Sequence, residues 1–135
     1  MTLAQNLVLL PHPRQLFVQP RSDRGKPGAF VLTDGARIFL QGDNAALLPL
    51  ATRLQQIIWE TQRLRWSLGA GDAPNDPQCR AVVSLDPQAD IPAQGYRLQI
   101  TPARIQLLAS DAAGVFYGLA TLRQMLRQCV GTLPA

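Results

Sequence analysis

The stretch Gln94–Leu126, QGYRLQITPARIQLLASDAAGVFYGLATLRQML, decides the fold of this chain. In its first half, apolar and polar residues alternate from Tyr96 to Ile100 and again from Ile105 to Ala109, with a Thr-Pro-Ala turn between the two runs. Alternation with a period of two places every second side chain on the same face of a strand. The pattern predicts a β-hairpin with one buried face.

The second half of this stretch has the spacing of a helix. Ser110 or Asp111 is suited to cap its N-terminus, and the helix is predicted to run to about Gln128. Glycine costs about 1 kcal/mol relative to alanine within a helix, so Gly114 and Gly118, four residues apart, indicate a side where another backbone approaches closely. A buried stripe is predicted at apolar residues three and four apart: Val115, Phe116, Leu119, Leu122 and Leu126.

The residues before this stretch predict a strand, two loops and a second helix. Ala81–Asp86 is strongly apolar and is predicted to be a strand. Gly69–Gln78 and Pro87–Gln94 are rich in Gly, Pro and Asp and are predicted to be loops. A long helix is predicted from Asp43 or Asn44 to about Arg65, with an apolar stripe at Leu47, Leu50, Ala51, Leu54, Ile57 and Ile58.

Pro49 bears on where this helix begins. Proline lacks a backbone N–H and is best tolerated in the first turn, where that N–H has no partner to lose. The position of Pro49 therefore favours a start nearer Leu48.

Strands are also predicted near the N-terminus. Gln15–Gln19 reads as a short strand, and Pro20–Gly28 as a loop of proline, glycine and charged residues. Phe30–Thr33 and Arg37–Gln41 are predicted to form a hairpin through Asp34-Gly35, a dipeptide favoured in tight turns. Together, these elements predict one α+β domain over residues 1–135.

Charge, hydropathy and cysteine content exclude several classes of protein. The formal net charge is +4, but the arginines are scattered, and the loose basic run from Arg14 to Lys26 contains a single aromatic residue, Phe17. We therefore expect no nucleic-acid partner. No segment reaches the ~20 apolar residues of a membrane helix, and the first residues lack the basic start of a signal peptide. Cys79 and Cys129 are predicted to be free thiols.

No catalytic, cofactor-binding or metal-binding constellation is evident. His12 is the single histidine, and Glu60 is the single glutamate, placed on the solvent side of the predicted long helix. The aspartates are interpreted as helix caps and turn formers, and the nucleotide-binding and nucleophile motifs are absent. Most of the candidate sugar-stacking aromatics are predicted to pack in the core instead: Trp59, Trp66, Tyr96, Phe116 and Tyr117.

The hairpin and helix of Gln94–Leu126 resemble the close of the domain that precedes the catalytic barrel in family-20 glycoside hydrolases, the β-N-acetylhexosaminidases. The resemblance is specific over this stretch and weaker over the rest of the chain. It rests on a Gly-Tyr strand, an I-x-L-x-A strand and an Asp-x-x-Gly-x-Phe-Tyr-Gly-x-x-T-L-x-Q helix, met by Gly95, Tyr96, Ile105, Leu107, Ala109, Asp111, Gly114, Phe116, Tyr117, Gly118, Thr121, Leu122 and Gln124.

The resemblance implies a zincin-like α+β domain, with a mostly antiparallel or mixed sheet and two long helices on one face. A (β/α)₈ barrel is then expected after residue 135. In that barrel, an adjacent Asp-Glu pair performs substrate-assisted, retaining hydrolysis of terminal N-acetylhexosamines. No Asp-Glu dipeptide occurs in this chain, so no catalytic residue is carried over.

The barrel is the partner that the resemblance implies, and a glycan would be bound only by the whole enzyme. A periplasmic or secreted location is favoured by the family. A severed domain interface would leave an exposed apolar patch, through which the fragment could dimerise. Two alternatives remain open: the corresponding domain of an α-glucuronidase or O-GlcNAc hydrolase, and a free-standing carbohydrate- or protein-binding module.

Overall fold

The computed structural model of the protein describes residues 16–18, 29–70, 77–129 and 131–135. The predicted loop Pro20–Gly28 and the histidine at position 12 lie outside these residues. The helices and strands, in chain order, are β1 (Leu16–Val18), β2 (Ala29–Val31), β3 (Arg37–Gln41), α1 (Asn44–Gln62), β4 (Ser67–Ala70), β5 (Cys79–Leu85), β6 (Tyr96–Ile100), β7 (Ile105–Ala109), α2 (Ala112–Gln128) and β8 (Thr132–Pro134).

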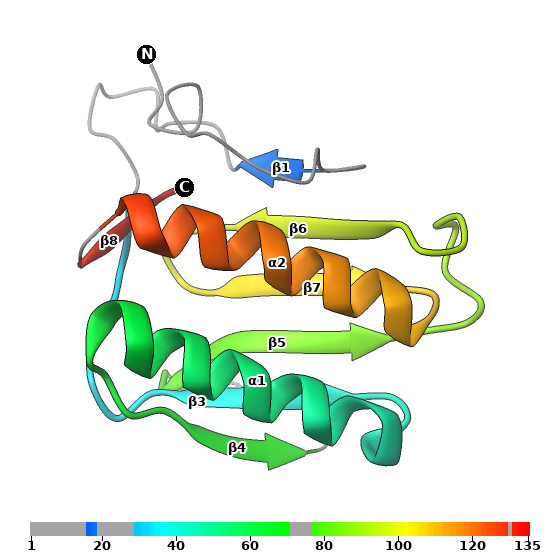
Figure 1. The fold of residues 1–135 in the computed structure, drawn as a ribbon, viewed down its shortest axis with the longest axis horizontal. Helices are drawn as coiled ribbons and strands as arrows, with labels where there is room; N and C mark the ends of the chain where they lie inside the picture. Colours follow the sequence, from blue (N-terminus) through cyan, green and yellow to red (C-terminus); the bar gives the residue numbers. More distant parts are fainter. Residues whose placement is uncertain (1–15, 19–28, 71–76, 130) are drawn as a thin grey trace.

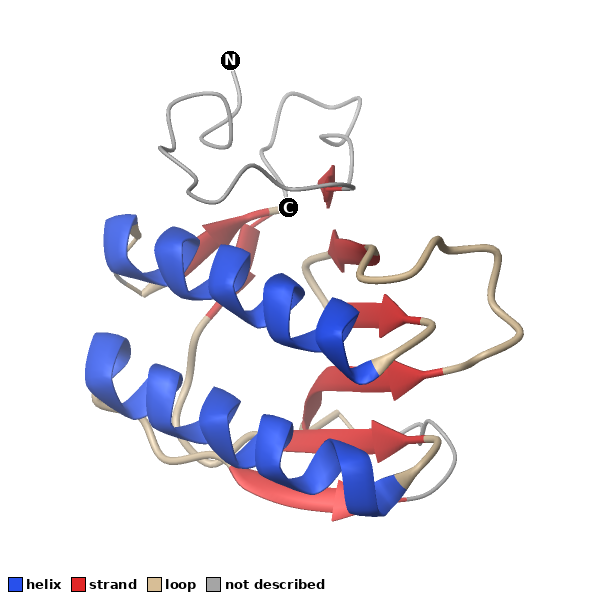
Figure 2. Cartoon of the chain, turned by 45° about the vertical axis from the view of Figure 1, so that its right-hand side comes forward, coloured by secondary structure: helices blue, strands red, loops and turns tan. Residues whose placement is uncertain are grey.

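The described elements form two layers, a β-sheet and a pair of helices, and the predicted α+β class is confirmed. Six strands make one mixed sheet in the order β1-β6-β7-β5-β3-β4, while β2 and β8 pair in a separate ribbon. Both helices lie side by side on the same face of the large sheet (Figures 1 and 2). The sheet is mixed rather than mostly antiparallel. Among the described pairings in it, β6 with β7 is antiparallel and the others are parallel.

The predicted hairpin is confirmed as β6 and β7. Their register pairs Tyr96 with Ala109 and Ile100 with Ile105. On both strands every second residue is buried beneath the helices, which accounts for the alternating sequence. The strand predicted over Ala81–Asp86 is also confirmed, as β5, which lies between β7 and β3.

Helix α2 follows the hairpin and packs on it through glycines. Asp111 is its N-cap, as predicted. A Cβ atom placed on Gly114 would lie 2.1 Å from the carbonyl oxygen of Gly95, and one on Gly118 would lie 2.3 Å from Cδ1 of Leu107. The close backbone approach predicted from these two glycines is therefore confirmed at Gly114, whereas at Gly118 the close neighbour is a side chain. The predicted stripe is wrong at Phe116, whose side chain is 43% exposed.

Helix α1 begins earlier than Pro49 suggested. The Asp43 carboxylate accepts hydrogen bonds from the N–H groups of Ala45 and Ala46, and this cap places the start at Asn44. Pro49 therefore lies inside the helix, and the expectation of a start near Leu48 is wrong. Proline deprives the Ala45 carbonyl of a helical partner, but both residues are exposed, so water can replace it.

Helix α1 also ends three residues before the predicted Arg65. Arg63 adopts a left-handed conformation with φ 59° and caps the helix through its N–H to the Trp59 carbonyl. The Gln62 side chain donates to the carbonyls of Leu126 and Cys129, at 2.9 Å each. These contacts tie the end of α1 to the end of α2.

The hairpin predicted from β2 to β3 does not form. Asp34 and Gly35 do make a turn, but they bind the segment after α1: the Asp34 carboxylate accepts from the N–H of Arg65 at 2.7 Å. β2 pairs instead with β8, and β3 lies between β4 and β5. Both β2 and β3 therefore pair with strands that are distant in the sequence instead of with each other.

Strand β4 was not predicted, because Gly69 and Ala70 read as the start of a loop. The strand is an edge of the sheet, and its register places Gly69 opposite Phe39. A Cβ on Gly69 would lie 3.1 Å from the Phe39 ring, so the missing side chain makes room for that ring. This requirement is tertiary and leaves no periodic signal in the sequence.

Candidate functional site

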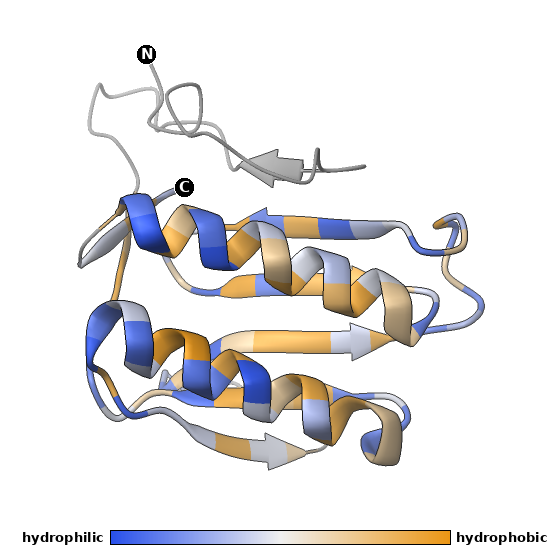
Figure 3. Ribbon diagram, in the orientation of Figure 1, coloured by the Kyte–Doolittle hydropathy of each residue, from blue (hydrophilic) through white to orange (hydrophobic). Residues whose placement is uncertain are grey.

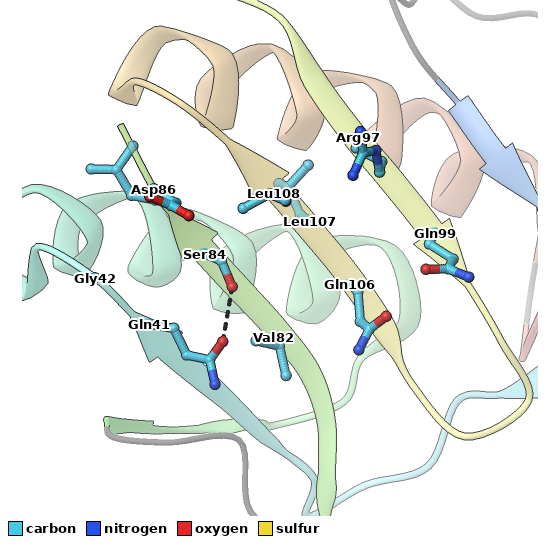
Figure 4. Close-up of a pocket in the computed structure, with 11 residues that line it drawn as sticks. Gln41, Gly42, Val82, Ser84, Asp86, Arg97, Gln99, Gln106, Leu107 and Leu108 are labelled. Atoms are coloured by element: carbon cyan, nitrogen blue, oxygen red, sulfur yellow. Dashed lines mark hydrogen bonds between the residues drawn. The ribbon is translucent and has the colours of Figure 1, made fainter. Parts of the chain in front are cut away.

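Two surfaces of the domain could take part in function, and the first lies on the helix-free face of the sheet. A groove of about 600 Å³ follows β5 there. The register sets Gln41 beside Ser84, Ser84 beside Leu108, and Leu108 beside Arg97. Figure 4 shows the small side chains of β5 along the floor, with longer amide side chains from the neighbouring strands on either side.

The sheet groove combines hydroxyl and amide groups with apolar side chains and one arginine, Arg97. Ser84 Oγ donates to Gln41 Oε1 at 3.1 Å, and Gln99 and Gln106 lie across the groove. Asp86 is the one carboxylate among the lining residues. General acid–base hydrolysis of a glycoside needs two acidic groups across the bond, so this groove does not hold that machinery.

Most of the described acidic side chains hold local structure. Asp43 and Asp111 cap the two helices. The carboxylate of Asp34 accepts from a backbone N–H across the turn, and that of Asp86 accepts from the N–H of Gln88 at 2.9 Å. Glu60 is exposed on α1, as predicted, and accepts from the Gln56 amide at 3.0 Å.

Neither metal ligation nor membrane insertion is indicated in the described ranges. No group of three or more His, Cys, Asp or Glu side chains within residues 16–18, 29–70, 77–129 and 131–135 could hold a metal ion. Cys79 and Cys129 are both buried free thiols, and burial raises the pKa of Cys129. Within the same described residues, no helix is both long and apolar enough to cross a membrane.

One buried polar pair joins the hairpin to α2. The Tyr96 hydroxyl hydrogen-bonds to the hydroxyl of Thr121, and both side chains are almost fully buried. Burial raises the pKa of Tyr96, and the hydrogen bond with Thr121 partly opposes that rise. The pair satisfies two groups that would otherwise be costly inside the core, so it has a structural role.

The second surface is the outward side of the two helices, called here the helix face and made of Arg53, Trp59, Phe116, Tyr117, Arg123 and Arg127. Core packing was predicted for most of the five aromatics. It is confirmed for Trp66 and Tyr96 and wrong for the other three: Trp59 and Tyr117 are each 38% exposed, and Phe116 is 43% exposed. The helical stripe pattern alone did not separate positions at the edge of the stripe from those at its centre.

Arginine side chains lie against these exposed rings. The guanidinium carbon of Arg53 lies 5.2 Å from the centroid of the Phe116 ring. Those of Arg63 and Arg65 lie 5.4 Å and 4.6 Å from the Trp59 ring. Exposed aromatics with arginine, and few carboxylates, are the composition of a protein–protein interface rather than of an ordinary surface.

The geometry defines a class: an α+β domain with a capped helix pair, exposed aromatic and arginine side chains on its helix face and, among its described residues, no assembled catalytic group. Residues 13–135 match the family model described as glycosyl hydrolase family 20, domain 2. The chain belongs to this family. The resemblance found in Gln94–Leu126 is thereby confirmed and extended over nearly the whole sequence.

Solved structures show the same fold. A mutant β-hexosaminidase of Streptomyces plicatus, in complex with its product GlcNAc, matches with a TM-score of 0.65 and 19% identity over 82% of this chain. The β-N-acetylhexosaminidase of Bacteroides fragilis matches with a TM-score of 0.58 and 20% identity over 95% of this chain. The chain spans only 22% and 23% of these two proteins. No curated protein matches the sequence.

Proposed function

We propose that this chain is the non-catalytic domain of a β-N-acetylhexosaminidase and serves as a scaffold that packs against the catalytic barrel. Family membership supports this proposal, together with the assignment of each described carboxylate of α1 and α2 to a cap or a surface hydrogen bond. The catalytic residues are then expected in the barrel, beyond residue 135. The terminal N-acetylhexosamine is recognised there and not in this domain.

The helix face is the surface proposed to contact the barrel. It carries Trp59, Phe116 and Tyr117 in exposed positions, whereas none of the residues that line the sheet groove is aromatic. Burying an aromatic side chain stabilises an interface by roughly 25 cal/mol per Å² of apolar surface. Exposed rings on one side of the domain are therefore the strongest sign of which side is covered.

This 135-residue chain alone is expected to be inactive on a chromogenic N-acetylglucosaminide. The reason is that two acidic groups, or one acid and an orienting aspartate, must flank the glycosidic bond. Release of the chromophore should be measured with the chain alone and with the enzyme that carries both domains. Turnover by the chain alone, at a rate near that of the enzyme, would contradict the proposal.

A second candidate function is carbohydrate binding, and the sheet groove is the observation that favours it. Gln41, Gln99 and Gln106 offer paired amide donors and acceptors above the apolar surface of Val82. Titration of the chain with chitooligosaccharides by calorimetry discriminates the two. Saturable micromolar binding, lost in Gln106→Ala, would support a binding module; the scaffold proposal predicts none.

A further inference from the structure

A groove runs between the two helices, on the side away from the sheet. It has a volume of about 390 Å³ and is lined by Arg53 and Ile57 of α1 and by Arg123, Gln124 and Arg127 of α2. A smaller hollow of about 120 Å³, between Arg53, Arg123 and Glu60, adjoins it. The buried Ile57 side chain is 3% exposed, so the groove has an apolar floor with arginines along its rim.

The groove carries an excess of positive charge. Three arginines line it, and the nearest carboxylate among the lining residues, that of Glu60 in the adjoining hollow, accepts a hydrogen bond from Gln56 at 3.0 Å. Figure 3 shows strongly hydrophilic residues along the outer faces of both helices, interspersed with hydrophobic ones. The local charge is therefore about +2, set beside exposed aromatic rings.

The two arginines that α2 contributes to the groove do not stabilise the isolated domain through their spacing. Arg123 and Arg127 are four residues apart on α2, and like charges at this spacing destabilise a helix by roughly 0.2–0.5 kcal/mol. Arg127 lies in the last turn, where the helix dipole favours a cation. Arg53 of α1 lies against the Phe116 ring, but neither the dipole nor a ring contact accounts for Arg123, which is only half-buried. A partner that brings negative charge would.

We propose that the groove between α1 and α2 receives carboxylate side chains from the catalytic barrel, which Arg53, Arg123 and Arg127 hold as ion pairs. The inference rests on the proposed function and specifies the chemistry of its interface. Arginine binds carboxylates through two parallel hydrogen bonds and is favoured in interfaces over lysine. A nucleic acid would need a continuous basic track, and Glu60 interrupts the track here.

The experiment compares thermal unfolding of the enzyme that carries both domains with that of the 135-residue chain. Arg123→Gln and Gln106→Glu are a matched pair: each lowers the net charge by one, but Gln106 lies on the opposite face of the sheet. In the enzyme at 50 mM salt, Arg123→Gln should lower the melting temperature of this domain by about 3 °C or more, and the control by less than about 1 °C. In the chain alone, Arg123→Gln should leave that temperature unchanged or raise it slightly, because a repulsion is removed.

At 500 mM salt, the decrease caused by Arg123→Gln in the enzyme should shrink by about half, because ion pairs are screened. Equal behaviour of Arg123→Gln and Gln106→Glu in the enzyme would overturn the inference. A Trp59→Ser variant separates this failure from that of the proposed function. If Trp59→Ser destabilises the domain only in the enzyme while Arg123→Gln has no effect, the helix face still docks on the barrel but the groove holds no ion pairs. If neither variant has an effect in the enzyme, both the docking of the helix face and the ion pairs are contradicted.

One further outcome identifies a different occupant. A fluorescent single-stranded oligonucleotide, titrated into the chain alone, should show no saturable binding at 150 mM salt. Saturable binding that Arg123→Glu abolishes would assign the groove to a polyanion and overturn the proposal.

Discussion

Gly114→Ala is expected to lower the free energy of unfolding of this domain by about 3 kcal/mol or more. An added Cβ would lie 2.1 Å from the Gly95 carbonyl oxygen and 2.9 Å from Cβ of Ala109. Both obstacles belong to the backbone or are fixed to it, so α2 must move away from the β6–β7 hairpin. Overpacking costs roughly 1–3 kcal/mol where side chains can adjust, and more where they cannot.

Gly118→Ala is the matched control, because it lies on the same helix and gains the same helix propensity, about 1 kcal/mol. Its new Cβ would meet Cδ1 of Leu107 at 2.3 Å, at the far end of a side chain that can rotate. We expect a net change within about 1 kcal/mol, since the propensity gain offsets the repacking. Urea denaturation followed by circular dichroism measures both variants. Equal stabilities of the two would show that the backbone contact at Gly114 is not limiting.

Asp111→Ala is expected to lower the free energy of unfolding by about 2–3 kcal/mol. One carboxylate oxygen accepts from the N–H of Gly114 at 2.8 Å and caps α2. The other accepts from the N–H of Gln94 at 3.0 Å, which fixes a residue with φ 63° just before the hairpin. The Asp111 side chain therefore holds both ends of the segment that runs from Gln94 to the start of α2.

Asp43→Ala provides the comparison, because Asp43 caps α1 but has no second role. One of its carboxylate oxygens accepts from two adjacent N–H groups at 3.1 Å and 3.3 Å, and the residue is exposed. A loss of about 1 kcal/mol is expected there. Chemical denaturation of the two variants side by side tests the difference. If Asp111→Ala cost no more than Asp43→Ala, the link to Gln94 would contribute nothing measurable.

These two sites explain why the hairpin–helix stretch is so informative. The glycines at 114 and 118, the cap at 111 and the alternating strands each report a contact made within about thirty residues. Local contacts leave a local pattern, so both the structure and the family resemblance could be predicted from this stretch. The candidate interface was less predictable: the exposed rings of Trp59 and Phe116 occur in patterns that also suit a core.

The sequence by itself determined the elements whose hydrogen bonds are local, namely the two helices, the β6–β7 hairpin and the cap of α2. It also indicated strand β5, through a continuous apolar run, although the partners of that strand, β3 and β7, are distant in the chain. It also determined that no Asp-Glu pair is present. Only the tertiary structure decided the pairings of β2 with β8 and of β3 with β4, the end of α1 at Gln62, and the arginine-lined groove. Each of these joins residues distant in the chain, and the energy of such a contact depends on neighbours that no short window of sequence contains.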